Sequence, residues 1–333
     1  MMSLSRTISG TQTISGTETP DLSSARKPKG RDVSGILLLD KPQGLSSNAC
    51  LQQVKRLLQA AKAGHTGALD PLATGVLPLC FGEATKVSQF LLDADKRYLT
   101  RIRLGERTNT ADAEGEVIST RSTAGIDREA VVKALSQFRG AIDQCPPMYS
   151  ALKHNGQPLY KLARAGVEVE RKIRRVTVHE LILHEFDSSS GVMELSLEIH
   201  CSKGTYVRTI ADDLGEALGC GGHVRELRRL QAGIFRIDEC ITPAALEALL
   251  ADGGLCAVDA LLRPADQAIA HLPQITLSPD MAQYIRQGQA VTVRPLPDSE
   301  LVRLYDQQEF IGIGAVLDDG RVAPRRLIRE QAR

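Results

Sequence analysis

Runs of apolar residues, and two different periods of apolar positions, predict strands and helices in mixed order along the chain. Apolar or alternating runs predict strands at residues 35–41, 75–82, 96–106, 173–187 and 192–202. Helical spacing predicts helices between the serines at 46 and 47 and Gly64, and at residues 82–95, 127–140, 203–219 and 242–254, with a loop at 107–116. Because these elements do not alternate strictly, we expect an α+β fold with a largely antiparallel mixed sheet.

The same pattern divides the chain into three parts. Residues 1–34 are rich in Ser, Thr and Gly and poor in large apolar side chains, so we expect a disordered tail. Its basic end, RKPKGR, leaves an RNA-binding arm as the alternative, and two acidic residues count against a transit peptide. Residues 35–265 carry the mixed elements of the main domain. Residues 273–330 show short strands separated by Gly, Pro and Asp, which predict a small β-barrel.

Composition restricts the function classes. The 333 residues carry 41 basic and 40 acidic side chains, a net charge of +1, so any basic surface for nucleic acid has to be local. No apolar run approaches the roughly 20 residues that span a bilayer, and the amino terminus lacks an apolar signal core, so we expect no membrane role. Seven cysteines without a CxxC pair favour the reducing cytoplasm over a disulfide framework or a zinc site.

The stretch GHTGALDPLATG, residues 64–75, holds a single carboxylate, Asp70, in a loop with little bulk. The proline after Asp70 biases it toward an extended conformation, and the glycines permit tight turns and close approach by a ligand. A solitary carboxylate can serve as a nucleophile or a general base, whereas a metal site needs more ligands than His65 adds. An ordinary turn is the alternative interpretation, and spacing by itself names no reaction.

Five blocks of the sequence resemble, in the same order, the blocks of the tRNA pseudouridine synthase B family, the bacterial tRNA pseudouridine-55 synthases. They are GHTGALDPLATGVLPLC, KRYLTRIRLGERTNTADAEG, PPMYSALKHNGQPLYKLARAG, SKGTYVRTIADDLGEALGCGGHV and ELRRLQAG. The resemblance covers about residues 35–330, and the visible departure is the long amino-terminal tail. It implies a pseudouridine synthase fold in the main domain and a PUA-like RNA-binding domain at residues 273–330.

The resemblance also implies an activity. Family members convert the uridine at position 55 in the T arm of tRNA to pseudouridine by breaking the N1 glycosidic bond, turning the base and rejoining it through C5. No atom is gained or lost, so the resemblance implies no cofactor and no metal. The family's catalytic aspartate matches Asp70, and the lack of an obvious second carboxylate agrees with isomerisation over hydrolysis. Attack at C1′, attack at C6 and removal of the 2′ proton to give a glycal stay open.

The remaining site residues are implied by the same resemblance. Arg208 matches the arginine that pairs with the catalytic aspartate, and a nearby cation keeps a desolvated carboxylate ionised. Tyr98 matches the tyrosine that stacks on the flipped base and is expected to take part in removing the C5 proton. Tyr206 and Leu227 match positions that line the uracil pocket, and His65 matches a histidine that enters the RNA stack. Without the resemblance, a surface arginine, a core leucine and ordinary polar groups are the simpler interpretation of these residues.

Binding the T arm also requires cations against its phosphates. The candidates are Lys86, Lys96, Arg97, Lys153, Lys161, residues 171–175 (RKIRR), Arg225, Arg228 and Arg229. Each of them has a solvated surface charge as its alternative. The expected partner is tRNA, without DNA or membrane, and a monomer is the default. Two rival functions stay open: an RNA-binding or tRNA-folding chaperone without turnover, and a guide-RNA-dependent pseudouridine synthase.

Overall fold

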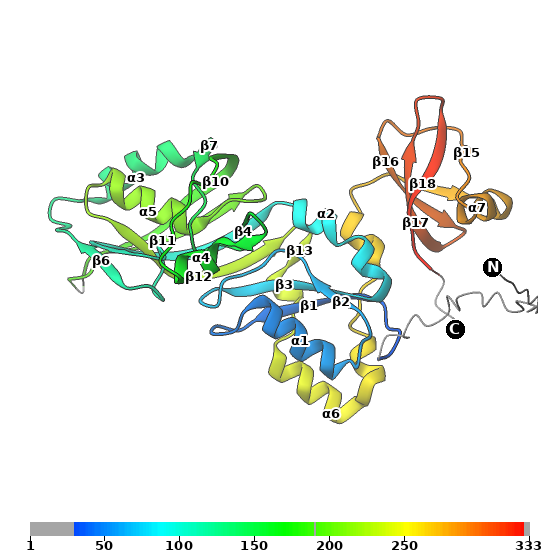
Figure 1. The fold of residues 1–333 in the computed structure, drawn as a ribbon, viewed down its shortest axis with the longest axis horizontal. Coiled ribbons are helices and arrows are strands. Elements are labelled where there is room, and N and C mark those ends of the chain that lie inside the picture. Colours follow the sequence, from blue (N-terminus) through cyan, green and yellow to red (C-terminus); the bar gives the residue numbers. More distant parts are fainter. Residues whose placement is uncertain (1–29, 190, 330–333) are drawn as a thin grey trace, which may run out of the picture.

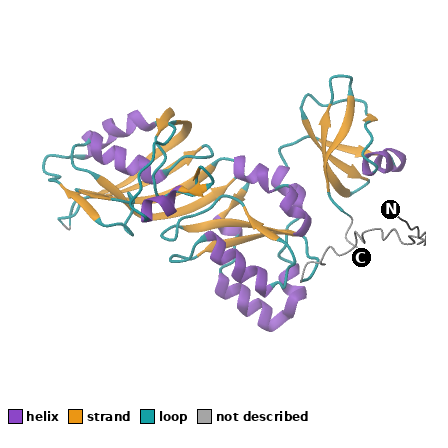
Figure 2. Cartoon of the chain, viewed as in Figure 1, coloured by secondary structure: helices purple, strands orange, loops and turns teal. Residues whose placement is uncertain are grey.

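The computed structural model describes residues 30–189 and 191–329, and its described residues form one large and one small sheet (Figures 1 and 2). The large sheet has nine strands in the order β1-β3-β12-β4-β11-β10-β7, with β2 paired to β3 and β13 to β12. Its pairings are antiparallel except that of β3 with β12. The predicted α+β fold with a largely antiparallel mixed sheet is confirmed.

Five of the nine strands of the large sheet follow the predicted apolar runs closely, whereas β2, β7, β12 and β13 were not predicted. The nine are β1 (Gly35–Lys41), β2 (Ala63–His65), β3 (Thr74–Phe81), β4 (Lys96–Leu104), β7 (Gly140–Gln144), β10 (Arg174–Asp187), β11 (Glu194–Cys201), β12 (Gly222–Ala232) and β13 (Phe235–Arg236). Two small hairpins lie outside it, β5 (Glu106–Thr108) with β6 (Val117–Thr120) and β8 (Lys153–His154) with β9 (Gln157–Pro158). The expected loop at 107–116 is therefore the inner part of the first hairpin.

Helices lie on both sides of the large sheet (Figure 1). The helices of this part are α1 (Ser47–Leu57), α2 (Ser88–Asp93), α3 (Arg128–Leu135), α4 (Leu159–Arg164), α5 (Val207–Ala217) and α6 (Pro243–Asp259). Side chains of α3 and α5 pack with β4, β10, β11 and β12 in one apolar cluster. Those of α1 and α6 pack with β1 and β3 in another. No helix in the described part of the chain is long and apolar enough to cross a membrane.

The boundaries of two predicted helices were wrong. The first begins as expected, because the Ser46 side chain accepts a hydrogen bond from Ala49 N, but it ends at Leu57 rather than near Gly64. Gln59 takes a left-handed φ of 53° there, and Gly64 belongs to β2. The segment 82–95 forms a 3₁₀ turn (Gly82–Lys86) before α2. Its Thr and Ser hydroxyls donate to nearby main-chain carbonyls, which competes with a regular helix.

The predicted tail lies outside the described residues up to residue 29, but its last five residues are packed. Arg31 forms a paired contact with Asp259 of α6, with two N to O distances of 2.8 Å. Val33 is buried among the residues of α1, β3 and α6. The prediction of a disordered tail was therefore wrong for residues 30–34, because an arginine in a basic run finds a carboxylate far away in the sequence.

The small sheet is formed by the carboxy-terminal residues. Its strands are β14 (Gln274–Leu277), β15 (Val291–Thr292), β16 (Leu301–Asp306), β17 (Glu309–Val316) and β18 (Arg321–Leu327), in the order β14-β16-β17-β18-β15. The predicted PUA-like β module is confirmed, and it also contains the unpredicted helix α7 (Pro279–Arg286), capped by Ser278. Ile313 packs in a cluster with residues of β1 and β3, and Lys86 Nζ donates to the carbonyl of Leu327 at 2.7 Å.

A glycine on β3 permits the parallel contact at the centre of the large sheet. Gly75 has a φ of 103°, and an added Cβ would lie 2.2 Å from the carbonyl oxygen of Arg229. We expect Gly75→Ala to lower the free energy of unfolding by at least about 3 kcal/mol, because strain and a main-chain clash coincide. Gly64→Ala is the matched control, because no atom lies within 4 Å of its added Cβ. Urea titrations that give equal losses for both variants would contradict this account.

Candidate active site

The loop between β2 and β3 that carries Asp70 is fixed through its main chain. Leu69 N donates to the hydroxyl of Ser47 at 2.7 Å, and that hydroxyl donates back to Leu69 O at 3.1 Å. Ala73 N donates to Asp70 O at 3.1 Å. This bond closes a turn with Asp first and Pro71 second, the positions that type I turns favour for these residues. The loop therefore holds Asp70 in place without using its carboxylate.

Two buried cations donate hydrogen bonds to main-chain carbonyls in and beside the loop. Lys41, at the end of β1, is 0% exposed, and its Nζ donates to the carbonyls of Pro42, Leu45 and Pro71. Arg229, on β12, is 1% exposed, and its guanidinium donates to Val76 O at 2.7 Å and Gly67 O at 3.0 Å. Sequence reasoning did not single out Lys41; the signal was the KPQG turn after an apolar strand. Carbonyls on both sides of Asp70 are thus anchored.

The carboxylate of Asp70 forms an ion pair with Arg208. Arg208 Nε lies 3.0 Å from Asp70 Oδ2. The arginine side chain is 5% exposed, whereas that of Asp70 is 41% exposed. Arg208 is near the start of α5, and its Nη2 donates to the carbonyl of Tyr149 at 2.7 Å. The structure therefore brings Asp70 and Arg208 together, with the cation inside and the carboxylate facing solvent.

A second carboxylate, which sequence reasoning missed, holds the other side of the arginine. Asp112 is 3% exposed, and its Oδ2 lies 3.4 Å from Arg208 Nη1. The same Nη1 donates to Thr110 O at 3.0 Å. The Thr110 hydroxyl and Glu114 N both donate to Asp112 Oδ1. In the sequence Asp112 is one of several acidic residues in a polar stretch, so only the fold distinguishes it.

The electrostatic environment of Asp70 has two opposing parts. Desolvation by the surrounding protein raises the pKa of Asp70 above its ordinary value, and the Coulombic attraction of Arg208 opposes this rise. Asp112 adds to the rise in the pKa of Asp70, and Lys41 acts with Arg208 against it. A carboxylate with a raised pKa that stays ionised at neutral pH is a stronger base than one in water. This arrangement suits a group that attacks an atom or accepts a proton.

The three residues expected around the base lie on elements that meet near this ion pair. Tyr98 on β4 is half-buried and packs against the cluster that contains Leu227 of β12. Burial raises the pKa of Tyr98, and the Coulombic attraction of Arg229, its register partner on β12, opposes that rise. Tyr206 is the N-cap residue of α5, two positions before Arg208, and burial raises the pKa of Tyr206 as well. Both phenols are therefore neutral at pH 7.

His65 is the last residue of β2, directly before the loop that carries Asp70. Its ring is half-buried, and its Nδ1 is buried without a hydrogen-bond partner. Burial and the neighbouring Arg229 lower the pKa of His65, so the imidazole is neutral at pH 7. The residue thus offers a flat uncharged ring beside the loop.

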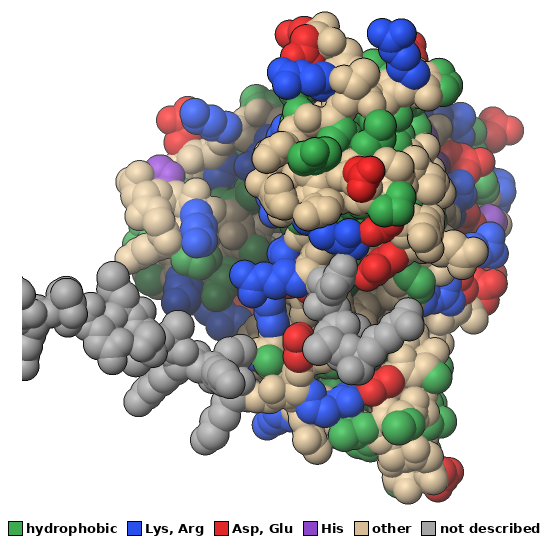
Figure 3. Space-filling model, turned by 90° about the vertical axis from the view of Figure 1, so that its right-hand side faces the viewer, with side chains coloured by type: hydrophobic (Ala, Val, Ile, Leu, Met, Phe, Trp, Pro, Cys, Tyr) green, Lys and Arg blue, Asp and Glu red, His purple; other side chains and the backbone are tan. Residues whose placement is uncertain are grey.

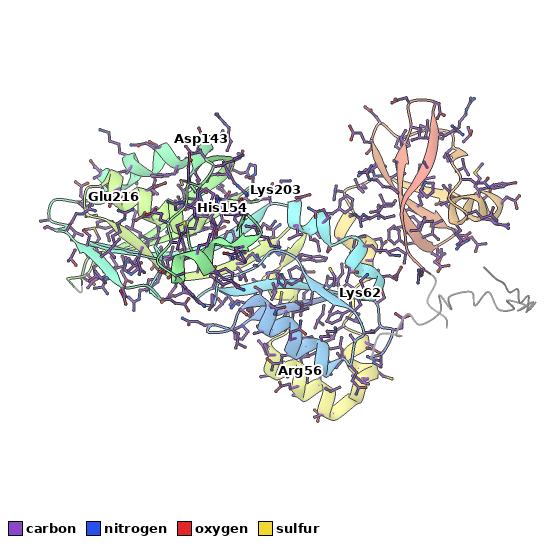
Figure 4. The ribbon with its side chains drawn as sticks, viewed as in Figure 1. Arg56, Lys62, Asp143, His154, Lys203 and Glu216 are labelled. Carbon is purple, nitrogen blue, oxygen red and sulfur yellow. The ribbon has the colours of Figure 1, made fainter. Side chains whose placement is uncertain are left out.

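The predicted phosphate-binding cations divide into buried, paired and free groups. Arg229 and Lys96 are buried and donate to main-chain carbonyls, and their predicted contact with phosphate stays a prediction. Lys86 pairs with Glu83, and Arg97 pairs with Glu180 and Glu198. Arg225 and Arg228 pair with Glu194 and Asp40, and Arg171 with Glu168. Lys153 and Lys161 are exposed, and His154, the residue after Lys153 in the β8–β9 hairpin, is labelled in Figure 4.

No cavity among the described residues marks the site more clearly. On the end of the molecule that carries the small sheet, basic and acidic side chains are interspersed (Figure 3). A cavity of about 540 Å³ lies beside the loop and is lined by Leu72, Glu114 and Leu227 among others. Neither Asp70 nor Tyr98 lines it. The ion pair, rather than the cavity, therefore defines the candidate site.

Family models match most of the chain. The model described as TruB family pseudouridylate synthase (N terminal domain) matches residues 55–207. The tRNA pseudouridylate synthase B C-terminal domain matches residues 208–270, and Pseudouridine synthase II TruB, C-terminal, matches residues 273–328. The first match contains Asp70 and the second begins at Arg208, so the ion pair joins the two matched parts.

Curated relatives and solved structures agree with the models. The chain is 53% identical to tRNA pseudouridine synthase B of Aeromonas salmonicida (strain A449), covering 92% of this chain and 98% of the relative. It is 54% identical to tRNA pseudouridine synthase B of Coxiella burnetii (strain Dugway 5J108-111), covering 90% and 96%. A chain from the structure of an H/ACA RNP bound to a substrate RNA containing 2′-deoxyuridine superposes with a TM-score of 0.67 at 22% identity, covering 89% of this chain and 85% of that one. That likeness concerns the fold.

Proposed function

This chain belongs to the TruB family of tRNA pseudouridine synthases, which are isomerases, and we propose that its substrate is the uridine at position 55 in the T arm of tRNA. The observation that carries the proposal is the ion pair between Asp70 and Arg208, with its carboxylate on the solvent side. An isomerisation needs one group that helps the base to leave C1′ and return through C5. A single ionised carboxylate meets that need.

We propose the following roles for the residues around Asp70. The N1–C1′ bond breaks, the base turns, the C5–C1′ bond forms, C5 loses a proton and N1 gains one. Attack at C1′, attack at C6 and removal of the 2′ proton all use the ionised form of the Asp70 carboxylate, which Arg208 supports. Tyr98 would stack on the flipped uracil, which offsets part of the cost of unstacking it. Tyr206 and Leu227 would line the same pocket.

The two sheets suggest a division of labour, which we also propose. Residues 35–265 would carry the chemistry, and residues 273–330 would bind RNA outside the T loop. Lys153 and Lys161 are exposed cations that could meet phosphates of the T arm without first leaving a carboxylate partner. The seven cysteines are free, which fits action in the cytoplasm. A monomer is the default proposal for the oligomeric state.

The test uses T-arm RNA with tritium at C5 of its uridines, incubated with the purified protein without added metal, nucleotide or guide RNA. We expect tritium release, and we expect none from an RNA that carries cytidine at position 55. Tritium release from both RNAs would contradict the assignment of the uridine at position 55 as the substrate. A need for added guide RNA would favour the guide-dependent function, and tight binding without release would favour the chaperone.

We expect His65→Ala to lower kcat/KM by about 5- to 150-fold, the range that corresponds to losing one stacking partner at ~1–3 kcal/mol. The neutral ring would stack on RNA where the flipped base has left, and it holds no charge that the reaction needs. The measurement is the rate of tritium release at subsaturating RNA. A loss too large to leave measurable activity would show that His65 takes part in the chemistry itself.

A further inference from the structure

Four cationic side chains surround the Asp70 loop in the protein interior. We call Lys41, Lys96, Arg208 and Arg229 the buried cation cluster; their exposed fractions are 0%, 7%, 4% and 1%. Lysine and arginine are almost never this buried unless a carboxylate pairs with them. The role of Arg208 beside Asp70 accounts for only one of the four.

The contacts of the cluster converge on the loop. Arg229 donates to Gly67 O and Lys41 to Pro71 O, on the two sides of Asp70. A Cβ added to Gly67 would lie 3.4 Å from Arg229 Nη1 and 3.8 Å from Lys96 Cε. Lys96 is thus near Arg229, and its Nζ donates to three carbonyls at the end of α2. Burial and this neighbouring guanidinium lower the pKa of Lys96 to about 8.

The cluster has fewer negative partners than positive charges. Arg208 faces the two carboxylates of Asp70 and Asp112. Within residues 30–189 and 191–329, the other three cations form no salt bridge, and they donate hydrogen bonds to main-chain carbonyls. Glu114 influences Lys41 electrostatically but is exposed to solvent. Four buried cations therefore face one buried carboxylate, that of Asp112, and the partly exposed carboxylate of Asp70.

Neutral donors could hold these carbonyls without the desolvation cost of a buried charge. Fixed charges in a water-poor site are effective where an opposite charge develops during the reaction, because they need no reorganisation at that moment. Tyr98, the residue proposed to stack on the uracil, lies directly beside Arg229. The excess positive charge thus lies in the interior beside Tyr98 rather than on the exposed surface.

We propose that the buried cation cluster stabilises the negative charge that the uracil ring acquires when its bond to C1′ breaks. This inference rests on the proposed isomerisation. The electron pair of the N1–C1′ bond stays on the uracil, where it spreads over the ring and its two carbonyl oxygens. C5 then returns a pair to C1′, the C5 proton leaves and N1 takes up a proton. Lys96 and Arg229 act through the field across Tyr98, without touching the substrate.

The test compares two leaving groups. Fluorine at C5 withdraws electrons and makes the uracil anion more stable by itself, so 5-fluorouracil depends less on the protein for this charge. The substrates are a whole tRNA transcribed with uridine or with 5-fluorouridine throughout. Cleavage of the N1–C1′ bond is measured in single-turnover reactions as loss of the N1-linked nucleoside after digestion. This readout needs no loss of a C5 proton, because 5-fluorouridine carries fluorine at that position.

The variants are Arg229→Gln and Lys96→Gln, which remove one charge each and keep an amide donor. We expect each to slow cleavage of uridine at least about tenfold more than cleavage of 5-fluorouridine. Ser47→Ala is the matched control, because it loosens the Asp70 loop without changing any charge and should slow both substrates equally. Two variants on separate strands keep the test valid when one of them fails to fold.

Equal slowing of both substrates by Arg229→Gln and Lys96→Gln would overturn the inference and leave these residues as braces of the loop. The position of the reacting uridine is read from the same digests by mapping. A product at another position would contradict the proposed substrate. The ratio of the cleavage rates of uridine and 5-fluorouridine would still test the role of the buried cation cluster.

Discussion

Asp70→Asn is expected to lower the rate of tritium release by at least about 10⁴-fold, the scale on which enzymes lose activity when their nucleophile is removed. The amide has the shape of the carboxylate but is neither a nucleophile nor a base at neutral pH. The loop should keep its conformation, because its hydrogen bonds to Ser47 and within the turn use main-chain atoms. The assay is the T-arm RNA reaction described above.

Two controls separate chemistry from folding in this variant. The thermal midpoint should change little, because the Asp70 carboxylate is the partly exposed member of its ion pair. RNA binding should persist, since the exposed cations are untouched. Tritium release by the variant at a rate near that of the wild type would show that another group carries the reaction.

Arg208→Lys is expected to lower kcat by about 10²- to 10³-fold, because a misplaced catalytic group costs this much. The guanidinium contacts Asp70, Asp112 and the carbonyls of Thr110 and Tyr149 at once. An ammonium group cannot reproduce this fork. The lysine keeps a positive charge beside the buried Asp112, so we expect a smaller loss of stability than for alanine, which would leave that carboxylate unpaired.

The pH profile of the same variant gives an independent readout. Activity requires ionised Asp70, whose pKa is raised above the ordinary value of about 3.9. Activity is therefore complete above this raised pKa and is lost as the pH falls through it. Because Arg208 lowers the pKa of Asp70, the weaker contact in Arg208→Lys should move the acid limb of kcat to higher pH.

Arg107→Lys is the matched control for this shift. Arg107 makes a paired contact with Asp212 on the same helix α5, at 2.6 and 2.8 Å, and does not touch Asp70. The same chemical change there should leave the acid limb where it is. An acid limb that stays at the wild-type pH in Arg208→Lys would show that Arg208 does not set the ionisation of Asp70.

Local chemistry made much of the fold predictable. Alternation and apolar runs located β1, β3, β4, β10 and β11, because a strand's period depends on its own side chains. Asp127 and Ser46 marked helix starts for the same reason, since a cap bonds within three residues. The α7 start signal, Ser278 before Pro279, was present but unused. Helix ends were less predictable because tertiary pairing competes for the same residues.

The candidate site contains some residues that the sequence identified and others whose place only the tertiary structure determined. The sequence alone marked Asp70, through its proline and glycines, and the resemblance added Arg208 and Tyr98. Only the tertiary structure separated Arg229, buried and bonded to Gly67 at a separation of 162 positions, from the exposed Lys153, although both read as surface cations. Turn and period are set by neighbours in the chain, whereas burial and ion pairing are set by what the topology brings together, and so only the fold could collect four cations around one loop.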